Sequence, residues 1–552
     1  MAPTSFGPQA TGGAADGRTA LPQGLMQDLP LTLELVLRRL ESVGAHVPVT
    51  SVLASGVVRH SWGEIALRSR RLITVLETLG VGAGARVATL AWNSHRHLEL
   101  FYAVPCGGRV LHTLNARVNP AQLLSQLERC GDSALFVDAS LTGLLAEHHA
   151  RLPVRTIVVM EDGGELAEPF AGAHRYEDLL AAAEPARELG PMSEQQALCI
   201  CHTSGTTGAA RAVVYSHRSV VLHALGALSI DSHGVSRDAV VLPLTPMFHL
   251  MAWGLPYSSA LAPAQLVLAG ADTSPAALAS LIERERVTLA AGIPTFWVRL
   301  LEALEDPQRD LSSLRRVLSG GSAAPRALAE RYLAAGVEFV SSWGMTEAGS
   351  GTTLRLTGTA ASADPSPTVR QGTAIAGVEL RIVDRDGDEL PWDDQAVGEL
   401  EVRGPWVCRA YLDVDEETNR RAFDDGWLRT GDIARIDPAG SVEIVDRLKD
   451  LIKSGGEWIS STELESHLAR QPAVAEAAVI AIVDETWGER PLAVLVAAAG
   501  EQIDLDVVRS GLAREVASWW MPERIEVLSE LPKTSVGKVD KQRLRERYAG
   551  GD

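Results

Sequence analysis

Residues 203–208 read Thr-Ser-Gly-Thr-Thr-Gly and lie between two apolar runs, 197–201 and 212–215. Two glycines let the backbone approach an anion and adopt positive φ, and four hydroxyl groups can donate to phosphate oxygens or contact Mg²⁺. Ordinary turns share this composition. The pattern Gly-x-x-x-x-Gly-Lys-Ser/Thr does not occur here, which excludes a Walker-type loop. The stretch therefore predicts either a phosphate-binding loop or a plain turn, placed between two strands.

The sequence around this loop predicts an α/β fold. Between 31 and 444, short apolar runs alternate with Ala/Leu/Arg-rich helical stretches, as where 281–285 is followed by 287–291. Such alternation indicates parallel sheets covered by helices. We expect a strand at 213–215, with Ser216 as the N-cap of a helix that includes 220–228.

A second domain is predicted near the C-terminus. The charged run Asp-Arg-Leu-Lys-Asp at 446–450 separates two apolar segments and suits a hinge. The part that follows, to about 548, has a predicted helix at 461–470 and strands at 475–483 and 492–499. We therefore expect a disordered tail at 1–27, a large domain at 28–448 and a small mobile domain at 449–552.

Composition narrows the class of protein. The 552 residues carry a formal net charge of −19, which argues against a protein that coats nucleic acid or an anionic membrane. The five cysteines have no metal-ligand spacing, and we expect them to be buried free thiols. The N-terminal residues lack a signal-peptide pattern, and no run of about 18 apolar residues occurs. We expect a cytoplasmic enzyme.

Three further segments combine residue types that could handle a nucleotide. Residues 342–347, Ser-Trp-Gly-Met-Thr-Glu, offer an aromatic ring for a base and a carboxylate for Mg²⁺, or the start of a helix capped by Thr346. Residues 427–432 end in Asp432, which can accept both hydroxyls of a ribose or can belong to a turn. Residues 531–538 present lysines on a loop, which alone indicate only an exposed surface.

In this order the segments resemble the adenylate-forming superfamily of acyl-CoA synthetases, luciferases and peptide-synthetase adenylation domains. The resemblance covers about 31–548. It is closest to the bacterial medium- and long-chain fatty acyl-CoA synthetases, on the evidence of 246–249 with Trp253, 320–326 and 446–461. It implies a large domain of helix-covered parallel sheets with a β-barrel-like subdomain, joined by a hinge to a mobile α+β domain.

The resemblance implies an acid–thiol ligase that uses ATP, Mg²⁺ and CoA. The carboxylate would attack the α-phosphate with release of pyrophosphate, and a thiol, normally that of CoA, would then take the acyl group from AMP. Thr203 and Glu347 would hold Mg²⁺, and Lys538 would bind the carboxylate and the α-phosphate as the catalytic cation. The other residues implied to bind ATP or AMP are Ser204, Gly205, Thr206, Thr207, Gly208, Arg211, Gly321, Ser341, Ser342, Trp343, Thr346, Asp432, Arg447, Lys449, Lys453 and Trp458.

The remaining implied residues concern the acid and CoA. His249, Trp253, Gly320 and Gly344 would form the acyl pocket and its gate. Amino-acid-activating relatives carry an aspartate where this chain has His249, so a plain carboxylic acid is expected. The small domain would rotate at Lys449 between the half-reactions and bring the loop of Gly455 and Gly456 to the CoA side. Family members are often homodimers.

The chain departs from the family pattern directly after Gly208. The family usually reads x-Pro-Lys-Gly, whereas residues 209–212 are Ala-Ala-Arg-Ala. Arg211 keeps a positive charge but not the point-like ammonium of lysine. Trp343 also replaces the more usual tyrosine. Two alternatives therefore stay open: an adenylating enzyme for an aromatic acid, or one whose acceptor is a carrier-protein thiol, an amine or a small inorganic nucleophile. A third reading, a nucleotide-binding protein without catalysis, conflicts with the retention of Thr203, Glu347, Asp432 and Lys538.

Overall fold

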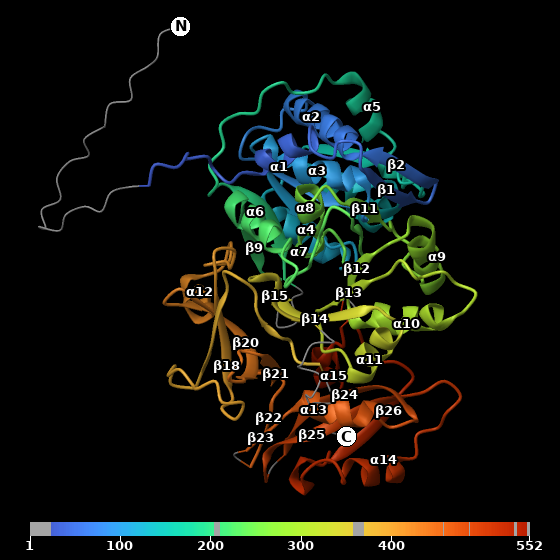
Figure 1. The fold of residues 1–552 in the computed structure, drawn as a ribbon, viewed down its shortest axis with the longest axis vertical. Helices are drawn as coiled ribbons and strands as arrows, with labels where there is room; N and C mark the ends of the chain where they lie inside the picture. Colours follow the sequence, from blue (N-terminus) through green and yellow to red (C-terminus); the bar gives the residue numbers. More distant parts are fainter. Residues whose placement is uncertain are drawn as a thin grey trace, which may run out of the picture. The chain divides into compact units, whose positions relative to one another are not determined.

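The computed structural model describes residues 24–203, 210–356, 369–455, 457–484, 486–534 and 538–548. The chain forms two units, 1–30 and 31–552. The described residues of the first unit, 24–30, form neither helix nor strand, and the rest of the predicted tail at 1–27 lies outside the described residues. All elements below belong to the second unit (Figure 1).

The largest sheet in the described part of the chain has nine strands. Six neighbouring strands pair in parallel, each with the next, in the order β14, β13, β12, β10, β11 and β1. Antiparallel strands lie at both ends of the sheet. In spatial order the strands are β16 (Thr373–Ala374), β15 (Gly349–Leu356), β14 (Glu338–Met345), β13 (Arg316–Ser319), β12 (Leu289–Gly292), β10 (Val240–Pro243), β11 (Gln265–Leu268), β1 (Pro48–Leu53) and β2 (Gly56–Ser61).

A second sheet is parallel except for its last pair, β8 and β9, which run antiparallel. Its described strands, in spatial order, are β7 (His174–Arg175), β6 (Thr156–Met160), β5 (Ala134–Asp138), β3 (Arg86–Leu90), β4 (Val110–Thr113), β8 (Ala197–His202) and β9 (Ala212–Ser216). The predicted phosphate loop therefore connects two strands, as the sequence indicates.

Successive residues of a strand face opposite sides of the sheet. The apolar strands therefore present apolar side chains on both faces, and helices cover the two large sheets. In β10, Val241 belongs to the core shared with the second sheet, whereas Leu242 packs with α9, α10 and α11. The helices of the large domain are α1 (Leu33–Leu40), α2 (Trp62–Thr78), α3 (His95–Cys106), α4 (Pro120–Cys130), α5 (Tyr176–Ala182), α6 (His217–Gly226), α7 (Leu250–Trp253), α8 (Leu255–Leu261), α9 (Pro275–Glu285), α10 (Pro294–Glu305), α11 (Arg326–Ala334) and α12 (Glu416–Ala422), with 3₁₀ segments at Ala139–Arg151 and Glu168–Phe170. Ser216 caps α6 as predicted, although this helix ends at Gly226 rather than at 228.

A third, antiparallel sheet corresponds to the expected β-barrel-like subdomain. Its described strands are β17 (Glu379–Val383), β18 (Gly398–Arg403), β20 (Trp427–Ile436), β19 (Phe423–Asp424) and β21 (Val442–Arg447). Strands β20 and β21 pair Asp432 with Arg447 in register. This pairing places two predicted nucleotide-binding residues side by side.

The C-terminal segment builds a sheet with its own core. Its elements are β22 (Ile452–Ser454), β23 (Glu457–Ile459), α13 (Ser461–Ala469), β24 (Val474–Asp484), β25 (Gly488–Ala497), α14 (Leu505–Leu512), a 3₁₀ segment at Ser518–Trp520, β26 (Arg524–Leu528) and α15 (Lys541–Tyr548). The predicted helix and the two predicted strands of this region are confirmed to within a few residues. The described helices of the whole chain include none with the length and apolar character needed to cross a membrane.

Candidate active site

A cavity of about 710 Å³ lies where the parallel strands of the nine-stranded sheet end. Thr245 follows β10, Ile293 follows β12 and Gly321 follows β13, and all three line it. The carboxyl ends of parallel strands are the usual place for a ligand in an α/β fold. Residues of the third sheet and Lys538 of the C-terminal segment complete the wall.

In this cavity the structure brings together most of the predicted site residues that it describes. Those that line it are Thr203, Arg211, His249, Trp253, Gly321, Ser342, Gly344, Thr346, Glu347, Arg447, Lys449 and Lys538. Ser204, Gly205, Thr206, Thr207, Gly208 and Gly456 lie outside the described residues. The other predicted residues either lie behind the wall or in the C-terminal hairpin.

The cavity wall is strongly cationic although the chain is acidic. Among the described lining residues, two carry carboxylates, Glu347 and Glu399, and seven carry positive charges: Arg117, Arg211, Arg421, Arg429, Arg447, Lys449 and Lys538. Glu399 is paired with Arg429 at 2.5 Å. Such a concentration of positive charge suits a polyanion such as a nucleoside triphosphate.

The two ends of the predicted phosphate loop are tied to each other. The backbone N–H of Thr203 donates to the carbonyl of Arg211 at 2.9 Å, and the N–H of Arg211 donates to Oγ1 of Thr203 at 3.1 Å. These bonds extend the β8–β9 ladder by one pair. Thr203 and Arg211 therefore stand at fixed positions on the cavity wall.

Glu347 lies in the turn between β14 and β15, so the alternative that residues 342–347 start a helix is wrong. Its Oε1 accepts a hydrogen bond of 2.5 Å from the hydroxyl of Tyr411, whose ring lies 5.0 Å from the guanidinium of Arg211. Burial raises the pKa of Glu347, and the hydrogen bond from Tyr411 opposes this shift. The carboxylate of Glu347 and the hydroxyl of Thr203 line the same cavity and offer hard oxygen donors that fit a divalent cation such as Mg²⁺.

Asp432 lies just behind the wall and is held from two sides. The indole Nε1 of Trp343 donates to its Oδ2 at 2.8 Å, and Nε of Arg447 lies 2.5 Å from its Oδ1. Ser341 and Gly320, like Asp432, are not among the residues that line the cavity. A Cβ built on Gly320 would lie 2.5 Å from Oγ of Ser342 and 3.1 Å from the indole of Trp253, so a side chain there would collide with the pocket wall.

Lys538 reaches the cavity from the C-terminal segment. A Cβ built on Gly321 would lie 3.7 Å from Cε of Lys538, which places the lysine stem against the glycine after β13. Burial, together with the charges of Arg447 and Lys449, lowers the pKa of Lys538 to about 8, while Asp432 opposes the shift. In the described conformation the ammonium of Lys538 therefore loses its proton slightly above neutral pH.

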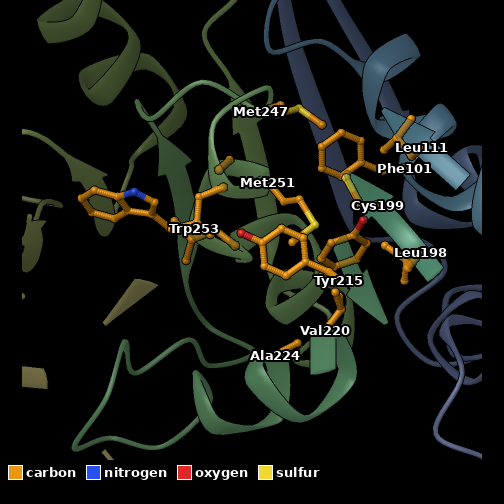
Figure 2. Close-up of a cluster of buried hydrophobic side chains, with 14 of the residues drawn as sticks. Phe101, Leu111, Leu198, Cys199, Tyr215, Val220, Ala224, Met247, Met251 and Trp253 are labelled. Atoms are coloured by element: carbon orange, nitrogen blue, oxygen red, sulfur yellow. The ribbon is translucent and has the colours of Figure 1, made fainter. Parts of the chain in front are cut away.

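Trp253, one of the predicted acyl-pocket residues, ends a left-handed turn. Leu250, Met251, Ala252 and Trp253 have φ values of 49°, 50°, 51° and 60°, an arrangement that L-residues seldom adopt in succession. Figure 2 shows the consequence: Met251 lies beside Tyr215 in the core, whereas the indole of Trp253 points the opposite way. The hydroxyl of Ser350 donates to the Trp253 carbonyl at 2.9 Å and holds the end of the turn.

His249 precedes this turn and lines the cavity. Burial and the positive charges of Lys538 and Arg117 lower its pKa to about 4. The imidazole is therefore neutral at pH 7. Leu250, Trp253, Ile293, Phe296 and Met345 contribute apolar side chains to the same cavity wall.

Three of the predicted residues that do not line the cavity lie in the β22–β23 hairpin. Lys453 and Trp458 pair with each other across the β22–β23 hairpin, with Nζ 5.1 Å from the ring centroid. The guanidinium of Arg385 lies over the same indole at 4.8 Å. Gly455, with φ of 61°, sits at the tip of this hairpin against Trp487.

Several lining residues were missed by the sequence reasoning. Tyr411, Arg117, Arg421 and Arg429 contribute to the wall, as do Ile293 and Phe296. A Gly-Ile-Pro segment directly after the strand at 289–292 marks a strand end in an α/β sheet and could have pointed to Ile293. Arg429 belongs to the segment 427–432, where only Asp432 was singled out, whereas Arg117 and Arg421 stand in segments without any recognisable pattern.

The fold and the site agree with the comparisons with known proteins. The family model described as AMP-binding enzyme matches residues 40–412, and the model of its C-terminal domain matches 463–538. A long-chain-fatty-acid–CoA ligase of Thermus thermophilus is 41% identical over 95% of this chain and 96% of its own. A 3-methylmercaptopropionyl-CoA ligase of Ruegeria pomeroyi is 40% identical over 95% of this chain and 98% of its own.

Solved structures agree in fold over almost the whole length. The anthranilate CoA ligase AuaEII in complex with anthranoyl-AMP superposes with a TM-score of 0.83 at 25% identity, covering 94% of this chain and 98% of that one. The cavity at the strand ends, the helix-covered parallel sheets and the separate C-terminal sheet agree with the fold of these adenylate-forming enzymes. The chain belongs to the AMP-binding enzyme family, and it is an AMP-forming acid–thiol ligase.

Proposed function

We propose that this ligase activates an apolar carboxylic acid, a medium- or long-chain fatty acid, and that Mg²⁺ assists the reaction with ATP before CoA takes the acyl group. The observation that carries the proposal is the mixed composition of the cavity wall. The wall contains seven cationic side chains and also the apolar side chains of Leu250, Trp253, Ile293, Phe296 and Met345. A substrate with an anionic head and an apolar body fits such a wall.

Lys538 is the proposed catalytic cation. In the first step a carboxylate oxygen bonds to the α-phosphorus of ATP and pyrophosphate leaves, so negative charge collects on the oxygens between acid and nucleotide. An ammonium beside Gly321 can neutralise this charge. In the second step the CoA sulfur bonds to the acyl carbon, and AMP leaves.

Thr203 and Glu347 are the proposed Mg²⁺-binding pair, and Ser204 to Gly208 with Arg211 the proposed partners of the β and γ phosphates. Gly321, Ser341, Ser342, Trp343 and Thr346 are proposed for the adenine and α-phosphate side, and Asp432 and Arg447 for the ribose. His249, Trp253, Gly320 and Gly344 are proposed for the acid. His249 supports an uncharged acyl group because a neutral imidazole offers no counter-charge to an amino acid.

We propose that the small domain begins at Lys449 and moves between the half-reactions. Four residues would then act only after this rotation, when they would contact CoA or the nucleotide: Lys453, Trp458, Gly455 and Gly456. The location of the first three on a hairpin away from the cavity supports this assignment. The proposed division of the chain is therefore a tail at 1–27, a large domain at 28–448 and a mobile domain at 449–552.

The acid is best identified with a panel of substrates. Purified protein would be incubated with ATP, Mg²⁺ and one acid at a time, with and without CoA, and pyrophosphate release and product mass would be recorded. Saturated fatty acids should give acyl-CoA at higher kcat/KM than 3-methylmercaptopropionate or anthranilate. A preference for either of the last two would replace the fatty-acid assignment, and adenylate without thioester would replace CoA as acceptor.

We also propose a cytoplasmic homodimer that does not bind nucleic acid. Its free cysteines fit a reducing compartment, and its net charge of −19 disfavours a nucleic-acid partner. The dimer rests on resemblance to the family. Light scattering coupled to size-exclusion chromatography would give its mass, and a monomer at working concentration would contradict it.

A further inference from the structure

Three potential metal ligands converge outside the cavity, at the base of the phosphate loop. They are His112 at the middle of β4, Cys130 at the end of α4 and His202 at the end of β8, and their ligand atoms all lie within 4.8 Å of one another. Nε2 of His112 lies 2.9 Å from Nε2 of His202, and Sγ of Cys130 lies 3.8 Å from that same nitrogen of His202. Residues 90 positions apart thus meet at one point.

The surroundings of His112 are those of a metal-binding histidine. Its Nδ1 lies 2.7 Å from Oδ2 of Asp132, and both side chains are fully buried. A carboxylate on the second ring nitrogen fixes the tautomer in which Nε2 can coordinate, and metal-bound histidines almost always donate that second N–H to a carboxylate, a backbone carbonyl or water. Asp132 is thus a positioning residue for His112.

The donor set selects the class of metal. One thiolate and two imidazoles suit Zn²⁺ and similar first-row ions, whereas Mg²⁺ and Ca²⁺ prefer oxygen. Tetrahedral zinc at ordinary Zn–N lengths separates two histidine nitrogens by about 3.3 Å. The two Nε2 atoms need to part by only a few tenths of an ångström from their present separation. His112 and Cys130 are buried, and His202 is half-buried.

We propose that His112, Cys130 and His202 form a binding site for Zn²⁺ or a similar first-row transition-metal ion, with Asp132 orienting His112. The site lies at the root of the loop that begins at Thr203, the residue next to His202. Arg129, next to Cys130, donates to the carbonyl of Ala210 at 3.3 Å on the other side of that loop. Bound metal links β4, α4 and β8 and so restrains both ends of the loop. This inference is independent of the substrate and of the roles proposed for the cavity.

The test measures metal binding directly. Untagged protein, kept reduced with a phosphine and freed of metal by chelator, would be titrated with Zn²⁺ and with Co²⁺. We expect one equivalent of each per chain, a thiolate-to-cobalt charge-transfer band in the near ultraviolet and a melting temperature that rises with Zn²⁺ concentration. Cys130→Ser should abolish the charge-transfer band, and His202→Gln should weaken binding at least tenfold.

Asp132→Asn distinguishes a metal site from a buried polar cluster. This variant should keep the charge-transfer band but bind Zn²⁺ about 10- to 100-fold more weakly, as loss of a partner carboxylate does elsewhere. Cys106→Ala removes a buried thiol from α3, and His174→Gln removes an exposed imidazole from β7; both should bind metal like the unmodified protein. Equal Zn²⁺ affinity in Cys130→Ser, His202→Gln and the unmodified chain would overturn the proposal, as would the absence of the charge-transfer band.

Discussion

The indole N–H of Trp343 donates a hydrogen bond of 2.8 Å to Asp432, whose other carboxylate oxygen lies 2.5 Å from Nε of Arg447. Trp343 therefore orients the carboxylate that we assign to the ribose. The tyrosine that is usual at this position would donate from a hydroxyl at a different distance from the backbone. Trp343 and Asp432 belong to different sheets, since Trp343 lies in β14 and Asp432 in β20. The bond thus couples the third sheet to the nine-stranded sheet at the proposed nucleotide site.

Replacing this indole tests that coupling. Trp343→Phe should raise the KM for ATP on the order of tenfold, because a hydrogen bond to a charged group contributes about 1.5–3 kcal/mol, and should change kcat less. Steady-state kinetics at saturating acid and CoA would measure both constants. An unchanged KM for ATP would show that Arg447 alone holds Asp432.

Lys538→Ala should abolish carboxylate-dependent ATP–pyrophosphate exchange and leave nucleotide binding largely intact. The reason is that the ammonium neutralises charge that develops between the carboxylate and the α-phosphate. Isotope exchange would report the first step, and equilibrium binding of ATP would serve as the control. Exchange at the unmodified rate would remove Lys538 from its proposed role.

The lowered pKa of Lys538 gives the first step a defined pH dependence. The amine carries its proton below a pKa of about 8 and loses it above, so kcat/KM for ATP in pyrophosphate exchange should fall as the pH rises through about 8. Lys449→Gln removes one of the positive charges that lower this pKa, and the fall should move to higher pH. Profiles that coincide for the two proteins would contradict the electrostatic coupling.

Tyr411→Phe should weaken the use of Mg²⁺. Its hydroxyl donates to Glu347, and without that bond the buried carboxylate keeps less of its charge at neutral pH because burial raises its pKa. We expect the Mg²⁺ concentration for half-maximal pyrophosphate exchange to rise on the order of tenfold. Tyr332→Phe, at a buried tyrosine bonded to the Trp297 carbonyl, is the matched control and should leave this concentration unchanged.

The fold and much of the cavity could be predicted because local patterns determine them. Alternating apolar runs indicated the helix-covered sheets, and short motifs around Thr203, Glu347, Arg447 and Lys538 marked residues that line one cavity. The motif of Glu347 alone also suggested a helix start, but pairing of β14 with β15 turns the chain there instead. The partner strand, Gly349–Leu356, lies just beyond these six residues, so their pattern alone does not contain the pairing.

Other features depend on contacts between distant segments. Tyr411 contacts Glu347 from 64 positions away, and no spacing rule links them. The cluster of His112, Cys130 and His202 escaped the search for metal-ligand spacing because adjacent strands of a parallel sheet bring the two histidines together. The left-handed turn at Leu250–Trp253 was not predicted either, since these residue types favour a right-handed backbone.

Arg211→Lys tests how far the phosphate loop has adapted to its unusual sequence. The backbone of residue 211 is fixed by its two bonds to Thr203, and a lysine there can still bring a positive charge to the cavity. What it loses is the stacking of a planar guanidinium on Tyr411 at 5.0 Å, an interaction of about 0.5–1 kcal/mol at an accessible site. We therefore expect kcat/KM for ATP to fall by less than about fivefold, whereas Arg211→Ala, the matched loss of charge, should lose far more. A loss in Arg211→Lys as large as that in Arg211→Ala would mean that the fork of the guanidinium, rather than its charge, is what the loop requires.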